Sequence, residues 1–149
     1  MERGSNRAYR RRYMRHPSSM PIEFRRLGDG QRHRNALHDI SCAGLSFRSQ
    51  EPFDEGEIVE VRLAILGHEV RATGRVAWCN ALDVGAWRVG LLLSDGQTGH
   101  AVRMIEQLCH IELYRERQRK QGRELSSEEA AREWIERFAS DFPSPIDAE

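Results

Sequence analysis

The chain has 149 residues, 31% charged and 39% hydrophobic, and its 23 basic and 23 acidic residues give a formal net charge of zero. This length allows one domain with a short extension, and the composition is that of a folded protein rather than a disordered one. No apolar run approaches the roughly 20 residues needed to span a bilayer, and the N-terminus lacks the apolar segment of a secretory signal. We therefore expect a cytoplasmic protein without membrane contact.

The charges are unevenly distributed along the chain. Residues 1–34 carry ten basic and three acidic groups, a net charge of +7, and residues 35–149 carry a net charge of −7. Six arginines fall within the first fifteen residues, where apolar residues are scarce and no helical or strand period is visible. We expect residues 1–19 to form a flexible, Arg-rich N-terminal arm.

Residues 20–94 consist of short β-branched and aliphatic runs separated by turn residues. Val59, Val61 and Leu63, for example, alternate with charged residues, as the two faces of a strand do. Gly74, inside one of these runs, predicts a bulge or a bend. The predicted strands are Pro21–Leu27, Arg34–Ile40, Gly44–Ser49, Ile58–Leu66, Glu69–Cys79 and Trp87–Leu93. Six short strands at this spacing indicate a mainly β fold, a small barrel or sandwich.

After Gly99 the apolar period changes from two to about 3.6 residues, which predicts a helix over 100–118 that ends at Gly122. A second helix is predicted over 126–139, where Ser126 and Glu129 have the spacing of a capping box. These elements divide the chain into the arm (1–19), the β unit with the first helix (20–120), and an additional helix and tail (121–149).

Two interpretations of the second helix remain open. Its apolar stripe can pack beside the first helix, which would cover an open end of the barrel. Alternatively, Trp134, Ile135 and Phe138 can form a surface for self-association or for a partner. We expect a monomer or a weak homodimer.

No catalytic or metal-binding motif is present. The six histidines form no HExxH or paired metal spacing, and the chain has no GxSxG element, P-loop or dinucleotide fingerprint. The three cysteines form neither a CxxC pair nor an even disulfide set, so we expect free buried thiols. We expect no catalytic residues, no metal and no cofactor, and hence no enzyme.

Two short motifs stand out. Arg11 and Arg15 form an RxxxR element, and Asp39, Ser41 and Gly44 form a DxSxxG element that runs from the end of one predicted strand to the start of the next. By turn chemistry alone, the second element also fits a local Asx-type turn. Arg3/Arg7 and Arg7/Arg11 share the RxxxR spacing, and Arg11/Arg15 is preferred because only this pair stands at the distance from Pro21 that the family resemblance described next implies.

In this order, ahead of and within a six-strand pattern, the two motifs resemble the PilZ domain, the bacterial receptor module for cyclic di-GMP. The resemblance extends over roughly residues 10–115 and includes Trp78 and the segment 87–91. It implies a six-stranded antiparallel β-barrel followed by a C-terminal helix.

The resemblance also implies a ligand site. An arginine fork can bind a phosphate or the O6/N7 edge of guanine, and a carboxylate can accept hydrogen bonds from a guanine. A glycine lets backbone approach closely. Trp78 is compatible with a ligand contact or with a place in the core, and Arg10 suggests an intercalated dimer of the ligand. The implied ligand-binding residues are Arg10, Arg11, Arg12, Arg15, Asp39, Ser41, Gly44 and Trp78.

The function implied is a receptor or adaptor in which the arm clamps cyclic di-GMP onto the barrel and changes a surface for a protein partner of unknown identity. A nucleic-acid-binding barrel with a basic arm is an alternative, although the net charge of −7 beyond residue 34 disfavours tracking of a long polyanion. A PilZ-like interaction module that binds no ligand is another alternative.

Overall fold

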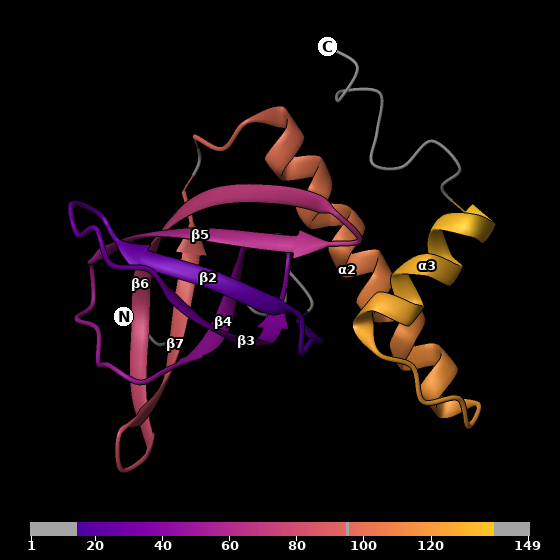
Figure 1. The fold of residues 1–149 in the computed structure, drawn as a ribbon, viewed down its shortest axis with the longest axis horizontal. Helices are drawn as coiled ribbons and strands as arrows, with labels where there is room; N and C mark the ends of the chain where they lie inside the picture. The colour runs from indigo at the N-terminus through magenta and orange to yellow at the C-terminus, as the bar shows by residue number, and fades with distance from the viewer. Residues whose placement is uncertain (1–14, 95, 139–149) are drawn as a thin grey trace, which may run out of the picture.

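The structure, a computed structural model, describes residues 15–94 and 96–138. Its strands form one antiparallel sheet in the order β1-β3-β2-β5-β6-β7-β4, and pairing of β3 with β4 closes the six strands β2 to β7 into a barrel (Figure 1). The strands are β1 (His16–Pro17), β2 (Pro21–Arg26), β3 (His33–Ile40), β4 (Gly44–Ser49), β5 (Ile58–Ile65), β6 (His68–Asp83) and β7 (Ala86–Leu93). The predicted six-stranded barrel is confirmed.

Apart from shifts of one residue at several strand ends, two features of the strands differ from the prediction. β1 is an additional strand that pairs with the end of β3, and its two residues are too few to show a period. β6 runs four residues past the predicted Cys79 because β6 and β7 continue to pair beyond Asn80, as far as the turn at Gly85. This hairpin extends from the barrel at the bottom of Figure 1.

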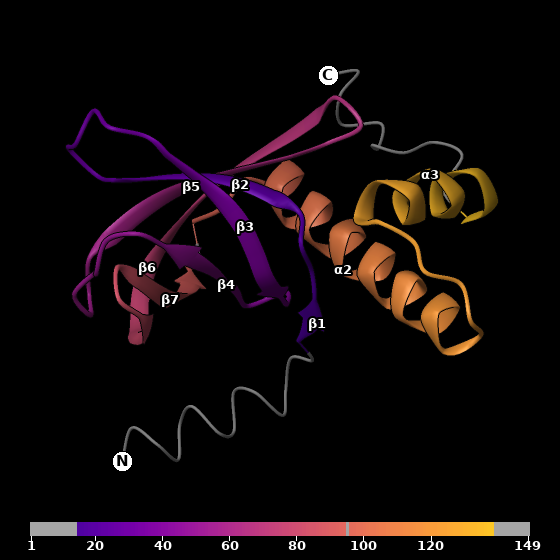
Figure 2. The same ribbon diagram turned by 60° about the horizontal axis from the view of Figure 1, so that its bottom comes forward.

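The core lies inside the barrel and under the first helix. Alternate residues of the strands point inward, such as Ile22 and Phe24 of β2 and Val61 of β5. α2 (Gly99–Lys120) contributes a further apolar stripe and contacts β1 and β6. Figure 2 shows this helix running past the barrel. The helix ends at Lys120, and Gly122 follows its cap with a φ of +88°, the left-handed conformation that glycine tolerates, as predicted.

α3 (Ser127–Phe138) packs along α2 (Figures 1 and 2). Its N-terminus is the predicted capping box: Ser126 Oγ accepts from the Glu129 amide at 3.0 Å, and Glu129 Oε1 accepts from the Ser126 amide at 2.9 Å. Ala130 and Ala131 are fully buried, whereas Phe138 is 63% exposed.

The three cysteines are free, but they are not all buried. Cys109 on α2 is buried, Cys79 is half-buried and Cys42, in the turn between β3 and β4, is exposed. The expectation of buried thiols is therefore wrong for Cys42, because a residue at the tip of a two-strand connection faces solvent. Burial, and after it the neighbouring Cys42 thiol, raise the pKa of Cys109.

Neither α2 nor α3, the helices of the described chain, is long and apolar enough to cross a membrane. Within residues 15–94 and 96–138, no three His, Cys, Asp or Glu side chains lie together in a way that could hold a metal ion.

Candidate ligand-binding site

The end of the RxxxR element lies beside the start of the DxSxxG element. β1 places Pro17 opposite Asp39 in the sheet, so the preceding Arg15 reaches the carboxylate. Arg15 Nη1 lies 3.3 Å from Asp39 Oδ1 and 3.5 Å from Oδ2. The two residues are 24 positions apart in the sequence, and the unpredicted strand β1 brings them together. Arg10, Arg11 and Arg12 lie outside the described residues.

A second hydrogen bond, from a serine on the neighbouring strand β4, also holds the Asp39 carboxylate. Ser46 of β4 is its register partner, and Ser46 Oγ donates a hydrogen bond of 2.8 Å to Asp39 Oδ1. Ser46 is fully buried. Sequence reasoning missed this residue, although its alternation with the inward-facing Leu45 and Phe47 marks it as an outward position on β4. Together, Arg15 and Ser46 fix the orientation of the carboxylate.

The connection between β3 and β4 is organised by Ser41 rather than by an Asx turn at Asp39. Ser41 Oγ accepts from the amides of Ala43 and Gly44, each at 3.2 Å, and donates to the Gly44 carbonyl at 3.2 Å. The hydroxyl is buried and engaged within the turn. The geometry shows that the Ser41 hydroxyl stabilises the turn between β3 and β4. A contact between this hydroxyl and a ligand remains a prediction.

Gly44 is needed for close packing of the barrel. A Cβ at this position would lie 2.1 Å from the carbonyl oxygen of Leu91 on β7, a distance that no side chain tolerates. The sequence prediction assigned this glycine to close approach of the ligand. In the described chain, the backbone that approaches Gly44 closely is that of β7.

Trp78 lies on the outside of the barrel because of a bulge in β6. Val76 pairs with Leu91 and Trp78 pairs with Gly90, so two steps along β6 match one step along β7. Val76 and Leu91 are buried in the core, and the extra residue turns Trp78 to the outer face with Gly90. The strict alternation that would have placed Trp78 with Val76 is broken here, so the indole is not part of the core.

The same register corrects the position of the bulge. It lies between Val76 and Trp78, not at Gly74, which pairs regularly with Val59 and Leu93. A Cβ on Gly74 would lie 2.8 Å from the carbonyl oxygen of Leu92, so this glycine marks a close approach of β7.

Gly90 provides the platform for the indole. A Cβ on Gly90 would lie 2.2 Å from Trp78 Cε2 and 2.5 Å from Nε1, so the ring rests directly on the glycine backbone. Sequence reasoning noted the segment that contains Gly90 but gave the glycine no role. The indole is half-buried, with apolar surface still open to a ligand.

These side chains form one continuous row across the outside of the barrel. The register joins Asp39 of β3 to Ser46 of β4, Ser46 to Gly90 of β7, and Gly90 to Trp78 of β6. A carboxylate with its arginine therefore stands at one end of the row and an indole at the other. Such a row can bind a flat heterocycle by stacking and hydrogen-bond its polar edge.

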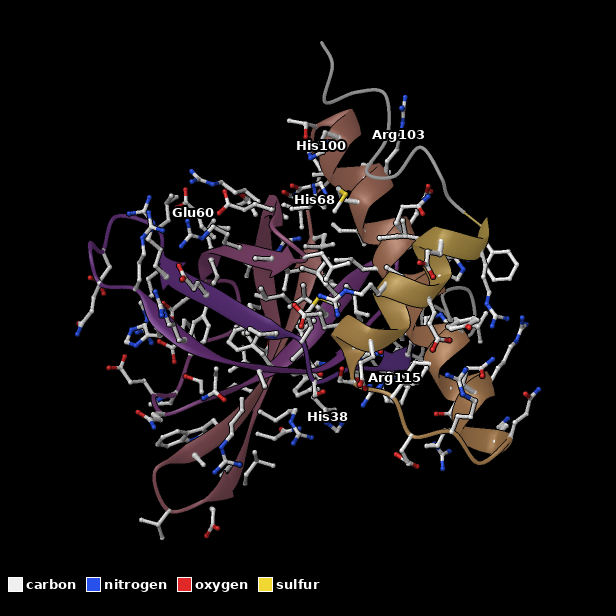
Figure 3. The ribbon with its side chains drawn as sticks, turned by 45° about the vertical axis from the view of Figure 1, so that its right-hand side comes forward. His38, Glu60, His68, His100, Arg103 and Arg115 are labelled. Carbon is white, nitrogen blue, oxygen red and sulfur yellow. The ribbon has the colours of Figure 1, made fainter. Side chains whose placement is uncertain are left out.

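The segment that carries Arg15 is anchored to the helices. Ser18 Oγ donates a hydrogen bond of 2.5 Å to Glu112 Oε2 on α2, and Ser127 Oγ at the start of α3 donates to the same oxygen at 2.8 Å. Arg115 Nη1 lies 3.2 Å from Glu112 Oε1, and Figure 3 shows Arg115 next to the start of α3. The Glu112 side chain is fully buried.

His16 of β1 lies between the site and this anchor. Burial lowers its pKa, the nearby Glu112 acts in the opposite direction, and His110 lowers it further. The neutral imidazole is therefore the form that the folded protein favours around β1.

Comparison with known proteins identifies the family to which this architecture belongs. The PilZ domain family model matches residues 9–110. Among solved structures, the MrkH–c-di-GMP complex of K. pneumonia has a TM-score of 0.59 at 18% identity, covering 74% of this chain and 55% of that chain. The Bacillus subtilis inhibitor of motility MotI/DgrA has a TM-score of 0.58 at 16% identity, covering 76% and 54%.

The PilZ domain of Escherichia coli YcgR with c-di-GMP has a TM-score of 0.56 at 17% identity, covering 76% of this chain and 96% of that domain. The chain thus spans about half the length of MrkH and MotI but nearly all of an isolated PilZ domain. No curated protein matches it. At these identities the solved structures show a common fold, and the family model covers more than half of the sequence. The chain belongs to the PilZ domain family.

Proposed function

We propose that this protein is a bacterial cytoplasmic receptor for cyclic di-GMP that acts by binding and not by catalysis. The observation that carries the proposal is the pairing of Arg15 with Asp39, which brings the two motifs together at one end of a row that ends in Trp78. Solved relatives of the same fold include complexes with c-di-GMP, which supports this choice of ligand. The protein would need no cofactor or metal.

The Arg15–Asp39 pair is suited to exchange partners. The side chains are 35% and 16% exposed, and an ion pair of this kind contributes only about 0–1 kcal/mol. A phosphate or a guanine edge offers the guanidinium two parallel hydrogen bonds, and the freed carboxylate can accept from guanine N–H groups. Exchange of the ion pair for ligand contacts therefore costs little and gains charge-assisted hydrogen bonds.

The switch would act through the arm. In this proposal Arg10, Arg11 and Arg12 close over the ligand and, with Arg15, neutralise its phosphates. The new surface of arm, ligand and barrel would then bind a protein partner. The anchoring of Ser18 to Glu112 supports a connection from the arm to α2 and α3, which lie outside the barrel.

Isothermal titration of cyclic di-GMP tests the proposal with the wild type, Arg15→Ala and Asp39→Ala. We expect the wild type to bind and each variant to lose at least about tenfold in affinity, which is a loss of roughly 1.4 kcal/mol. Arg34→Ala is the matched control, because this exposed arginine pairs with Glu23 on β2, away from the row. It should bind as the wild type does.

Absence of binding by the wild type would refute the receptor function and favour a PilZ-fold interaction module. A parallel titration with single-stranded oligonucleotide tests the nucleic-acid alternative. We expect no binding there, because most arginines on the β2 and β5 side of the barrel are paired with glutamates and offer no continuous basic track.

A further inference from the structure

The arginines on the outside of the barrel fall into two groups. Those on β2, β5, the β2–β3 connection, the start of β3 and the first four residues of β6 all pair with glutamates, and Figure 3 labels Glu60 on this side. The paired arginines are Arg25, Arg26, Arg32, Arg34, Arg62 and Arg71. Arg48 of β4, Arg88 of β7 and Arg75 of β6 have no ion pair or hydrogen bond to any other described side chain.

Two of the unpaired arginines face each other. Arg48 and Arg88 are direct register partners on β4 and β7. Like charges placed directly opposite each other on adjacent strands destabilise a sheet. On the opposite side of the barrel Arg62 and Arg71 are also direct register partners, but each of them pairs with a glutamate. Within the described chain no acidic residue pairs with Arg48 or Arg88.

Arg88 also has a buried N–H donor, its Nε, that lacks a hydrogen-bond acceptor among the described residues. Its Nε is shielded from solvent and makes no hydrogen bond within the described chain. A guanidinium nitrogen that has lost water without gaining an acceptor costs free energy, which a bound anion would recover. The side chain therefore needs a partner that this part of the chain does not supply.

The pair lies beside the ligand row. Arg48 follows Ser46 by two residues on β4, and Arg88 precedes Gly90 by two residues on β7, so both face outward next to that row. Asn80 of β6 is the next register partner of Arg88. Two residues along a strand span about 7 Å, which is within the dimensions of a dinucleotide and its stacked neighbour.

We propose that Arg48 and Arg88 form a second anionic subsite that binds a phosphate or guanine edge of cyclic di-GMP, next to the row from Asp39 to Trp78. Two guanidinium forks that face each other across adjacent strands can bind one phosphate from both sides or grip a guanine O6/N7 edge. Asn80 adds an amide donor and acceptor at the edge of the subsite. This proposal rests on the proposed function and names residues outside the two motifs.

The test is a titration of cyclic di-GMP against R48Q/R88Q, compared with R34Q/R71Q as the matched control. Both doubles remove two positive charges, but the control removes them from the ion-paired side. We expect at least a tenfold loss of affinity in R48Q/R88Q if the pair binds the same ligand molecule as Arg15. If it binds a second molecule, the stoichiometry should fall from two to one. The control should match the wild type.

Wild-type affinity and stoichiometry in R48Q/R88Q, together with weakened binding in Arg15→Ala, would overturn the subsite and leave the receptor function intact. If the wild type itself fails to bind, thermal unfolding with inorganic pyrophosphate at constant ionic strength decides the subsite separately. Pyrophosphate should raise the Tm of the wild type and of R34Q/R71Q more than that of R48Q/R88Q. An equal rise in all three would refute an anion site at this pair.

A purely structural role for the arginines predicts the opposite change in the ligand-free protein. Because the two charges repel, R48Q should raise the Tm without ligand by about 1–3 °C while weakening binding. A lower Tm with unchanged binding would show that Arg48 serves the fold and not a ligand.

Discussion

Ser18 and Glu112 are joined by a hydrogen bond of 2.5 Å although 94 positions separate them in the sequence. Ser18 lies three residues after Arg15, and Glu112 also accepts from Ser127 at the start of α3. One buried carboxylate therefore holds together the segment that enters the site, the helix that covers the core and the helix that follows it. Through this carboxylate the segment that carries Arg15 is connected to the start of α3.

Glu112→Ala should destabilise the protein by about 3–5 kcal/mol, because it leaves two buried serine hydroxyls and the half-buried Arg115 without their shared acceptor. Glu112→Gln preserves the shape and should cost less. Denaturant unfolding of the three proteins measures the effect.

Glu116→Ala is the control for this prediction. Glu116 lies one helical turn further on and pairs with Arg119 on the exposed side of α2, so its removal should leave the free energy of unfolding nearly unchanged. Equal destabilisation by the two alanine variants would contradict the role assigned to the buried carboxylate.

Gly90→Ala should displace the Trp78 indole, since the new Cβ would occupy the space of the ring. We expect a shifted indole N–H resonance for Trp78, a stability loss of about 1–3 kcal/mol from overpacking, and weaker binding of cyclic di-GMP. Gly96→Ala is a suitable control, because a Cβ there meets nothing within 4 Å. An unmoved Trp78 resonance in Gly90→Ala would contradict the outward placement of the indole.

Stability should fall as the pH decreases from about 6.5, partly because of His16. Its pKa in the folded protein is lower than the usual value of about 6.5, so between the two values the unfolded chain binds more protons. The contribution of His16 is complete above pH 6.5 and is lost as the pH falls toward the lowered pKa.

Denaturant unfolding at pH 7.5 and pH 5.5 checks this dependence in the wild type and in His16→Gln. The variant should show the smaller difference between the two pH values, because glutamine does not titrate. A pH dependence identical in the two proteins would show that the burial of β1 does not disfavour the charged imidazole.

Much of the fold follows from local pattern. The apolar alternation of β2 and β5 and the change to a 3.6-residue period after Gly99 predict the elements because burial of one face is a local requirement. The capping box of Ser126 and Glu129 and the end of α2 at Gly122 depend on residues within one turn of each other. The two motifs were also recognisable from residue type and spacing alone.

The sequence by itself thus determined the six strands of the barrel, the two helices and the location of Arg15, Asp39 and Gly44 in two motifs. Only the tertiary structure decided that Trp78 faces outward, because one bulged residue inverts the alternation of a strand and its position depends on pairing with β7. Only the tertiary structure, through strand register, places Arg48 opposite Arg88. It likewise brings Ser18 into contact with Glu112. Register and long-range hydrogen bonds join residues that no local pattern relates, and they determine which side chains share the site.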